Sequence, residues 1–107
     1  MTQIFNIKRG DTSPAIRFAL EPSDISLNGA AVQFQMRVIG GATVIDAPAT
    51  IDSASPPIVS YAWGAQDTAT PGLYQAEFRV TYLDGAIETF PNDAFINVRI
   101  NRDVADL

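Results

Sequence analysis

The chain lacks two of the side chains that most often carry catalysis and metal binding, because it contains no histidine and no cysteine. This removes the commonest general base, the commonest metal ligand, thiolate nucleophiles and disulfides. Oxygen ligands remain, since five aspartates fall near predicted turns, where several of them could meet at one end of the fold and bind calcium. The loop spacing of an EF-hand is not present, so turn formation is the favoured interpretation and calcium binding stays an open alternative. The five are Asp46, Asp52, Asp67, Asp84 and Asp93.

Two short glycine motifs also have turn formation as their favoured interpretation. Arg9-Gly10-Asp11 spells the adhesion tripeptide, but Gly-Asp at the end of a strand is common turn chemistry. Gly40-Gly41 lacks the strand-to-helix setting and the further glycines of a phosphate-binding loop. We therefore expect no enzyme, no catalytic residue, no metal, no cofactor and no small-molecule substrate.

Length and charge restrict the remaining classes of function. The chain has 107 residues and 47% hydrophobic content, which predicts a single domain over residues 1–107. Its net charge of −5 argues against nucleic acid or an anionic membrane as a partner. No apolar run is long enough to span a membrane, and the N-terminal residues lack the features of a signal peptide. We expect synthesis in the cytoplasm and a mature chain that begins at residue 1.

The elements that must position any site are strands, and the best defined covers residues 74–82. Apolar and polar side chains alternate there with a period of two, which is typical of an antiparallel strand with one buried face. Asp84-Gly85 follows, a pair that favours a two-residue hairpin turn with a positive φ angle at Gly85. We expect Leu83 and Ala86 to pair across this turn, before a return strand.

A corner precedes this strand. Asp67 begins a segment that turns at Pro71-Gly72, and Tyr74 follows two residues later. The arrangement resembles the tyrosine corner of immunoglobulin-like sandwiches, in which the phenol bonds to backbone a few residues upstream. Here the expected acceptor lies between Asp67 and Thr70. Antibody domains carry a cysteine two positions after this tyrosine, whereas this chain must hold its sheets together by packing.

Further strands are indicated by the same alternation. Residues 47–57 are rich in Pro, Ala and Ser and are expected to form loop or edge, with Ile51 pairing briefly, while the tail 102–107 is expected to fray. Val38 is expected to point inward as the last core residue of its strand. About seven or eight short strands without helical periodicity predict an all-β fold, a single antiparallel immunoglobulin-like β-sandwich. The additional stretches are residues 2–8, 15–20, 31–39, 43–46, 58–63 and 95–101.

Three motifs carry a resemblance to a known family. They are RGDTSPAI near the N-terminus, W-x₃-DTATPGLY-x-AEF-x-VTY in the middle and DG-x-x-ETFPND-x-F-x-x-V-x-I near the C-terminus. With the stretches between them, the chain resembles the N-terminal domain of phage baseplate upper proteins, small immunoglobulin-like modules of tailed-phage virions and prophages. The resemblance implies a structural virion protein in a tail, a baseplate or a head accessory. It also implies other virion proteins and further copies of the chain as partners.

Adjacent apolar residues predict where such partners would bind. Ile4 and Phe5 are neighbours, as are Phe95 and Ile96, so each of these strands must turn one apolar side chain away from the core. We expect intersubunit contacts at Phe5, Phe90 and Phe95, and carboxylates of neighbouring subunits at Arg9, Arg99 and Arg102.

The alternative function is a soluble carbohydrate- or ligand-binding sandwich. Such a site requires exposed aromatic side chains on one face. The alternation instead directs the candidate aromatic residues inward, which favours assembly over sugar binding. These residues are Tyr61, Trp63, Tyr74 and Tyr82.

Overall fold

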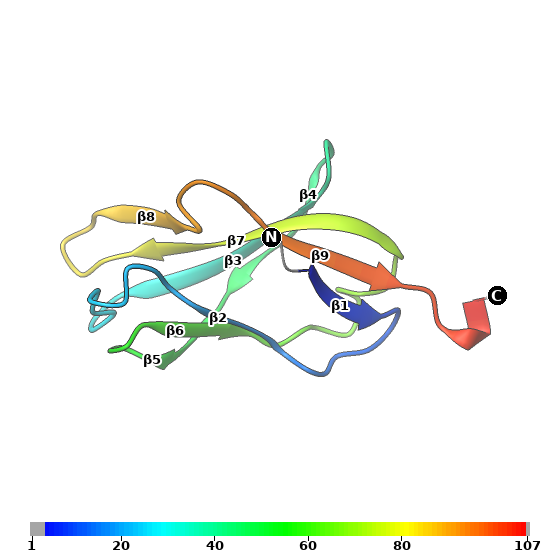
Figure 1. The fold of residues 1–107 in the computed structure, drawn as a ribbon, viewed down its shortest axis with the longest axis horizontal. Helices are drawn as coiled ribbons and strands as arrows, with labels where there is room; N and C mark the ends of the chain where they lie inside the picture. The colour runs from blue at the N-terminus through cyan, green and yellow to red at the C-terminus, as the bar shows by residue number, and fades with distance from the viewer. Residues whose placement is uncertain (1–3, 107) are drawn as a thin grey trace.

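The structure, a computed structural model, describes residues 4–106 and shows an all-β fold with a sandwich-like arrangement (Figure 1). Within the described residues there are nine strands, no α-helix and a single 3₁₀ turn, η1, at Val104–Asp106. The strands are β1 (Ile4–Lys8), β2 (Ile16–Ala19), β3 (Ala31–Val38), β4 (Thr43–Pro48), β5 (Thr50–Ser53), β6 (Ile58–Tyr61), β7 (Gly72–Thr81), β8 (Ile87–Phe90) and β9 (Ile96–Asn101).

The strands form two open sheets of unequal size. The larger has six strands in the order β1-β9-β7-β3-β4, with β8 also paired to β7, and the smaller has the order β2-β6-β5. The ten-residue strand β7 organises the larger sheet, because one edge of it pairs first with β9 and then with β8, while β3 pairs along its other edge.

The larger sheet is mixed, which corrects the prediction of a wholly antiparallel sandwich. Strand β1 runs parallel to β9, with Ile4 opposite Asn97 and Lys8 opposite Asn101, whereas the other pairs are antiparallel. Alternating hydrophobicity shows that one face of a strand is buried, but it carries no information about the direction of the neighbouring strand.

Aromatic side chains fill the space between the sheets. Phe34 of β3 stacks on Tyr61 of β6 with ring centroids 4.5 Å apart, and Trp63 meets both rings edge-on. Phe78 of β7 lies 5.1 Å from Phe34. Offset and edge-to-face contacts of this kind add about 0.5–1.5 kcal/mol beyond the burial of apolar area. Packing of these rings therefore joins the two sheets where an antibody domain would use a disulfide.

The β3–β4 hairpin departs from the predicted pattern near its tip. Val38 was expected to point inward, but 41% of its surface is exposed. The register of β3 with β4 shifts between Met36 and Arg37, a bulge whose extra residue lies in β4. Strand β3 stays in register with β7 as far as Val38, opposite Tyr74, so Val38 keeps the inward register but its side chain is not covered. Strand β4 also continues to Pro48, two residues beyond its predicted end.

The segment 47–57 is more regular than expected, because β5 pairs with β6 through Thr50–Ser53. The chain passes from the larger sheet to the smaller one between β4 and β5, where the Ala49 amide donates to the Val32 carbonyl at 2.8 Å. Ile51 does pair as predicted, opposite Val59 of β6. Of the two predicted alternatives, loop or edge, this stretch therefore includes an edge strand of the smaller sheet.

The described part of the molecule is elongated, with extents of 48 × 25 × 24 Å. We call the end where β7 begins and where β1 and β9 finish the corner end, and the opposite end, with the β7–β8 turn and the start of β3, the hairpin end (Figure 1). The buried apolar residues form one cluster between the sheets.

Candidate functional site

The tyrosine corner has the predicted geometry. Tyr74 is 5% exposed, and its hydroxyl donates to the backbone carbonyl of Thr70 at 2.6 Å. Gly72 has a φ of +154°, a region that L side chains rarely adopt, and a side chain added there would approach the Tyr74 ring. Glycine is therefore required where the chain turns into β7, beside the half-buried Pro71.

Asp67 holds the loop before the corner. One of its carboxylate oxygens accepts the Gly64 amide at 2.7 Å and the Tyr61 hydroxyl at 2.5 Å. Burial, assisted by the bond to Asp67 and the charge of that carboxylate, raises the pKa of Tyr61 to about 12. Tyr61 thus stays protonated and serves as a hydrogen-bond donor within the fold rather than as a nucleophile.

Three further hydrogen bonds attach Trp63 and the corner loop to the segment after β1, and no pattern in the sequence indicates any of them. Thr68 is fully buried, with its hydroxyl donating to the Asp11 carbonyl at 2.8 Å and its own carbonyl accepting the Gly10 amide. The Trp63 indole donates to the Pro14 carbonyl at 3.1 Å. Because these partners are more than 45 residues apart, only the assembled fold reveals them.

Between residues 4 and 106, no group of three or more His, Cys, Asp or Glu side chains is placed to hold a metal ion. Several turn aspartates instead bond to their own surroundings: Asp46 accepts from Gln33, Asp52 accepts from Ser60, and Asp84 accepts the Ala86 amide.

The β7–β8 turn contains three residues rather than two. The Tyr82 amide donates to the Ala86 carbonyl and the Gly85 amide donates to the Tyr82 carbonyl, so Tyr82 and Ala86 pair across the turn. The predicted pairing of Leu83 with Ala86 is wrong. Gly85 does have the expected positive φ, +91°. A type I turn followed by a left-handed glycine is the usual three-residue hairpin, and Asp-Gly suits this turn as well as the two-residue one.

Phe90 and Phe5 are not the exposed phenylalanines that the interface prediction required. Phe90 is 1% exposed and pairs opposite Phe78 within the larger sheet, so it is a core residue. Phe5 is half-buried against Trp63, with ring centroids 5.8 Å apart, and Ile4 is the side chain turned outward, at 42% exposure. The strand register decides which member of an adjacent pair faces the core.

Phe95 is exposed as expected. It lies on the outer face of the larger sheet, where the Arg37 guanidinium sits 5.1 Å above its ring centroid. Together with Gln75 and Glu77 these two residues line a shallow hollow of about 220 Å³. The outer face of the larger sheet thus combines an apolar ring, a cation and amide side chains.

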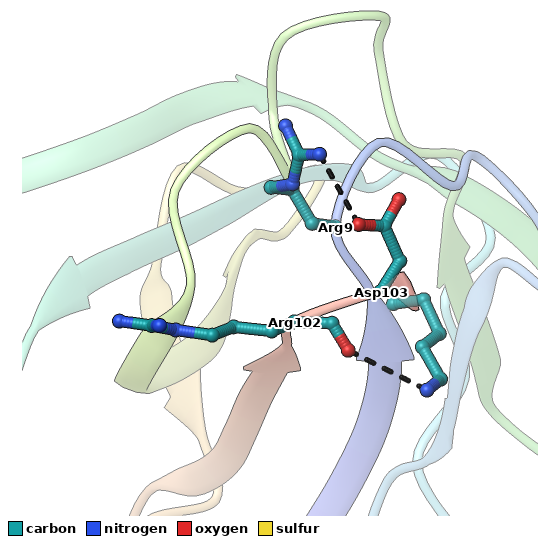
Figure 2. Close-up of polar contacts among 4 residues, drawn as sticks. Arg9, Arg102 and Asp103 are labelled. Carbon is teal, nitrogen blue, oxygen red and sulfur yellow. Dashed lines mark hydrogen bonds and ion pairs between the residues drawn. The ribbon is translucent and has the colours of Figure 1, made fainter. Parts of the chain in front are cut away.

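The three predicted rim arginines lie at or near the corner end. Arg9 forms an ion pair with the chain's own Asp103 at 3.1 Å, and Figure 2 shows the Arg102 side chain pointing away from that pair. Arg99 and Arg102 are exposed and line a hollow of about 370 Å³ with Leu73. Because the chain's own Asp103 pairs with Arg9, contact with carboxylates of neighbouring subunits stays a prediction for Arg99 and Arg102.

The described part of the tail, residues 102–106, is held by more contacts than the predicted fraying implies. The Lys8 ammonium donates to the Arg102 carbonyl at 3.4 Å, Asp103 pairs with Arg9, and η1 follows (Figure 2). Leu107, the last residue of the predicted frayed segment, lies outside the described residues.

Sequence reasoning missed a set of exposed aliphatic side chains at the two ends of the molecule. At the corner end these are Ile39 and Leu73, which are adjacent because the Ile39 amide donates to the Leu73 carbonyl, and both are 49% exposed. At the hairpin end they are Leu83 and Ile87, at 81% and 55%. For Ile39 and Leu83 the available signal was their position just before Gly40 and Asp84-Gly85, since hairpin tips extend beyond the core.

Comparison with protein-family models, with curated proteins and with solved structures finds no significant match to this chain. Among the described residues, no helix has the length and apolar character needed to cross a membrane.

Proposed function

We propose that the chain is a non-enzymatic structural protein of a tailed-phage or prophage-derived virion, built as an immunoglobulin-like sandwich. It assembles through repeated protein–protein contacts in the tail or baseplate, or as a head accessory. The three sequence motifs support the family, and the tyrosine corner supports the immunoglobulin-like fold. The observation that carries the assembly role is the kind of side chain left exposed: apart from Phe95, the large exposed apolar residues of the described chain are aliphatic.

Carbohydrate binding is the second candidate, and the same observation disfavours it. Sugar sites use exposed aromatic faces, but Tyr61, Trp63 and Tyr74 are 8%, 4% and 5% exposed, with their rings packed in the core. Exposed aliphatic side chains gain free energy when another protein covers them. The surface of this chain therefore suits a protein partner better than a sugar.

The outer face of the larger sheet is the proposed contact with another virion protein. Ile4 and Phe95 supply apolar contact, Arg37 supplies a cation, and Gln75 supplies amide hydrogen bonds. The outer face of the smaller sheet is more polar, since Arg17 forms an ion pair there with Asp52 at 3.2 Å. An apolar centre with a polar surround is the usual anatomy of a protein interface.

The experiment compares incorporation of variants into particles. Phe95→Ser and Ile4→Ser should fold normally and be lost from purified particles, as measured by quantitative mass spectrometry. Arg17→Ser, on the opposite face, should incorporate like the wild type. Phe90→Ser should fail to fold stably, because it removes a buried ring at a cost of about 3–5 kcal/mol.

Two outcomes would contradict the proposal. Absence of the wild-type protein from particles would remove the virion role, and normal incorporation of both face variants would remove the proposed contact. The neighbouring genes give an independent check: capsid, terminase or tail genes are expected, whereas a hydrolase gene would favour carbohydrate binding.

A further inference from the structure

Charge is distributed unevenly along the long axis of the molecule. Four of the seven basic residues lie at the corner end, although the chain as a whole carries a net charge of −5. The segment 80–90, which includes the β7–β8 turn, contains no lysine or arginine, although Arg79 stands just before it, opposite Thr89. The charged residues of the corner end are Lys8, Arg9, Asp11, Asp67, Arg99, Arg102, Asp103 and Asp106, and those nearest the hairpin end are Asp24, Arg79, Asp84 and Glu88.

Two of the four basic residues at the corner end, Arg99 and Arg102, present exposed guanidinium groups. Asp103 already pairs with Arg9, and Asp67 accepts from Gly64 and from Tyr61 within the loop. Arg99 and Arg102 are both exposed, and the Arg102 side chain extends away from the Arg9–Asp103 pair (Figure 2). The end therefore presents guanidinium groups, which favour carboxylate partners.

Each end also exposes an aliphatic pair beside its charges. Leu73 and Ile39 lie next to Arg99 at the corner end, where Leu73 pairs opposite Arg99 in the larger sheet. Leu83 and Ile87 flank Asp84 at the hairpin end. An exposed aliphatic pair thus stands beside exposed guanidinium groups at one end of the elongated molecule and beside an exposed carboxylate at the other (Figure 1).

We infer that the corner end of one copy binds the hairpin end of a second copy, so that the chain associates head to tail. Arg99 and Arg102 face Asp84 and its acidic neighbours across this contact, and Leu73 packs against Leu83. Such a contact is heterologous, because it joins two different surfaces and leaves one of each free to continue the array or close a ring. The inference deepens the proposed function by naming a partner, a second copy of the chain.

The size of the ends predicts a weak and salt-sensitive contact. A cross-section of 25 × 24 Å limits each end to about 600 Å², so joining two ends buries at most about 1,200 Å² in total, which is the lower limit for specific interfaces. Charges at a partly hydrated contact are screened over about 10 Å at 0.1 M salt. The association should therefore increase with protein concentration and weaken as salt is raised.

The test is sedimentation velocity of the purified protein over a range of concentrations, at low and at high salt. Leu73→Glu places a carboxylate opposite the acidic end, and Leu83→Lys places an ammonium opposite the basic end. For each variant alone, the dissociation constant of self-association should be at least about tenfold higher than for the wild type. Mixed in equal amounts, the two should associate again, because each contributes the intact end that the other lacks.

Arg17→Ser is the control, since it also alters one surface charge but lies on the outer face of the smaller sheet, outside both ends and outside the proposed contact with another virion protein. It should associate like the wild type. The inference is overturned if the wild type remains monomeric at the highest concentration, if only one of the two end variants matters, or if the mixture stays monomeric. None of these results bears on incorporation into particles, so failure of this inference and failure of the virion role are separable.

Discussion

The tyrosine corner allows a quantitative prediction for Tyr74→Phe, a change that removes one hydroxyl and keeps the ring. The hydroxyl donates to the Thr70 carbonyl at 2.6 Å from a residue that is 5% exposed. A hydrogen bond of this kind contributes about 0.5–1.5 kcal/mol, and more when the abandoned partner stays dry. Thr70 itself is exposed, so water can reach its carbonyl. We expect a loss of about 1 kcal/mol in the free energy of unfolding.

The measurement is urea unfolding followed by the fluorescence of the single tryptophan, Trp63, which is buried against Phe34. The midpoint should fall without a change in slope, since the exposed area of unfolding is unaltered. In a thermal scan the same loss corresponds to a decrease of about 4–8 °C in Tm for a domain of this size. Tyr82→Phe is the control, because its half-buried hydroxyl bonds to a side chain, Glu88, at 2.8 Å.

A Tyr74→Phe midpoint equal to that of the wild type would refute the reasoning, because it would mean that the corner bond adds nothing over hydration of its two partners. An equal loss in Tyr74→Phe and Tyr82→Phe would also refute it, since the effect would then belong to any phenol rather than to the corner.

Two further predictions concern the hairpin turn and the tyrosine hydroxyls. Gly85→Val should lower the free energy of unfolding by about 1–2 kcal/mol, because the φ of +91° at this position is strained for a β-branched residue. Gly85→Asn should lower it less, since Asn tolerates a positive φ better. Chemical denaturation measures both, and equal effects would contradict the turn geometry. The pKa values of Tyr61 and Tyr82 are raised from 10.0 to about 12, by burial first and then by Asp67 and Glu88. The folded state thus holds these protons more tightly, so their contribution to stability is complete below about pH 10 and is lost as pH rises towards 12. Tyrosinate absorbance should show the delayed ionisation, and Tyr61→Phe should reduce the alkaline loss of stability.

The sequence was sufficient for features that depend on local chemistry. The alternation in residues 74–82 predicted β7, in which Ala76, Phe78 and Val80 are buried, each with 1% or less of its surface exposed. The Pro-Gly turn before Tyr74 predicted the corner and its backbone acceptor. These features were predictable because one strand and its adjacent turn are determined by residues close together in the chain.

Features that depend on pairing between distant segments could not be predicted in the same way. The position of Phe90 in the core follows from its register opposite Phe78, and the outward position of Ile4 follows from the parallel pairing of β1 with β9. Adjacent apolar residues leave both faces possible, because a shift of one residue exchanges them. The buried Thr68 depends likewise on a partner 57 residues away.

The mismatch in strand length between the two sheets explains why apolar side chains remain exposed at the ends. Strand β7 has ten residues and β3 has eight, whereas β2, β5 and β6 of the facing sheet have four each. At about 3.3 Å per residue, β7 is roughly 20 Å longer than the strands that cover it. The ends of the larger sheet therefore extend past the smaller one, and among the described residues the hairpin tips that carry Ile39 and Leu83 stay exposed. Covering these tips requires another molecule, so the exposure at both ends is a consequence of the topology, and the opposite charges beside the tips favour a second copy as that molecule.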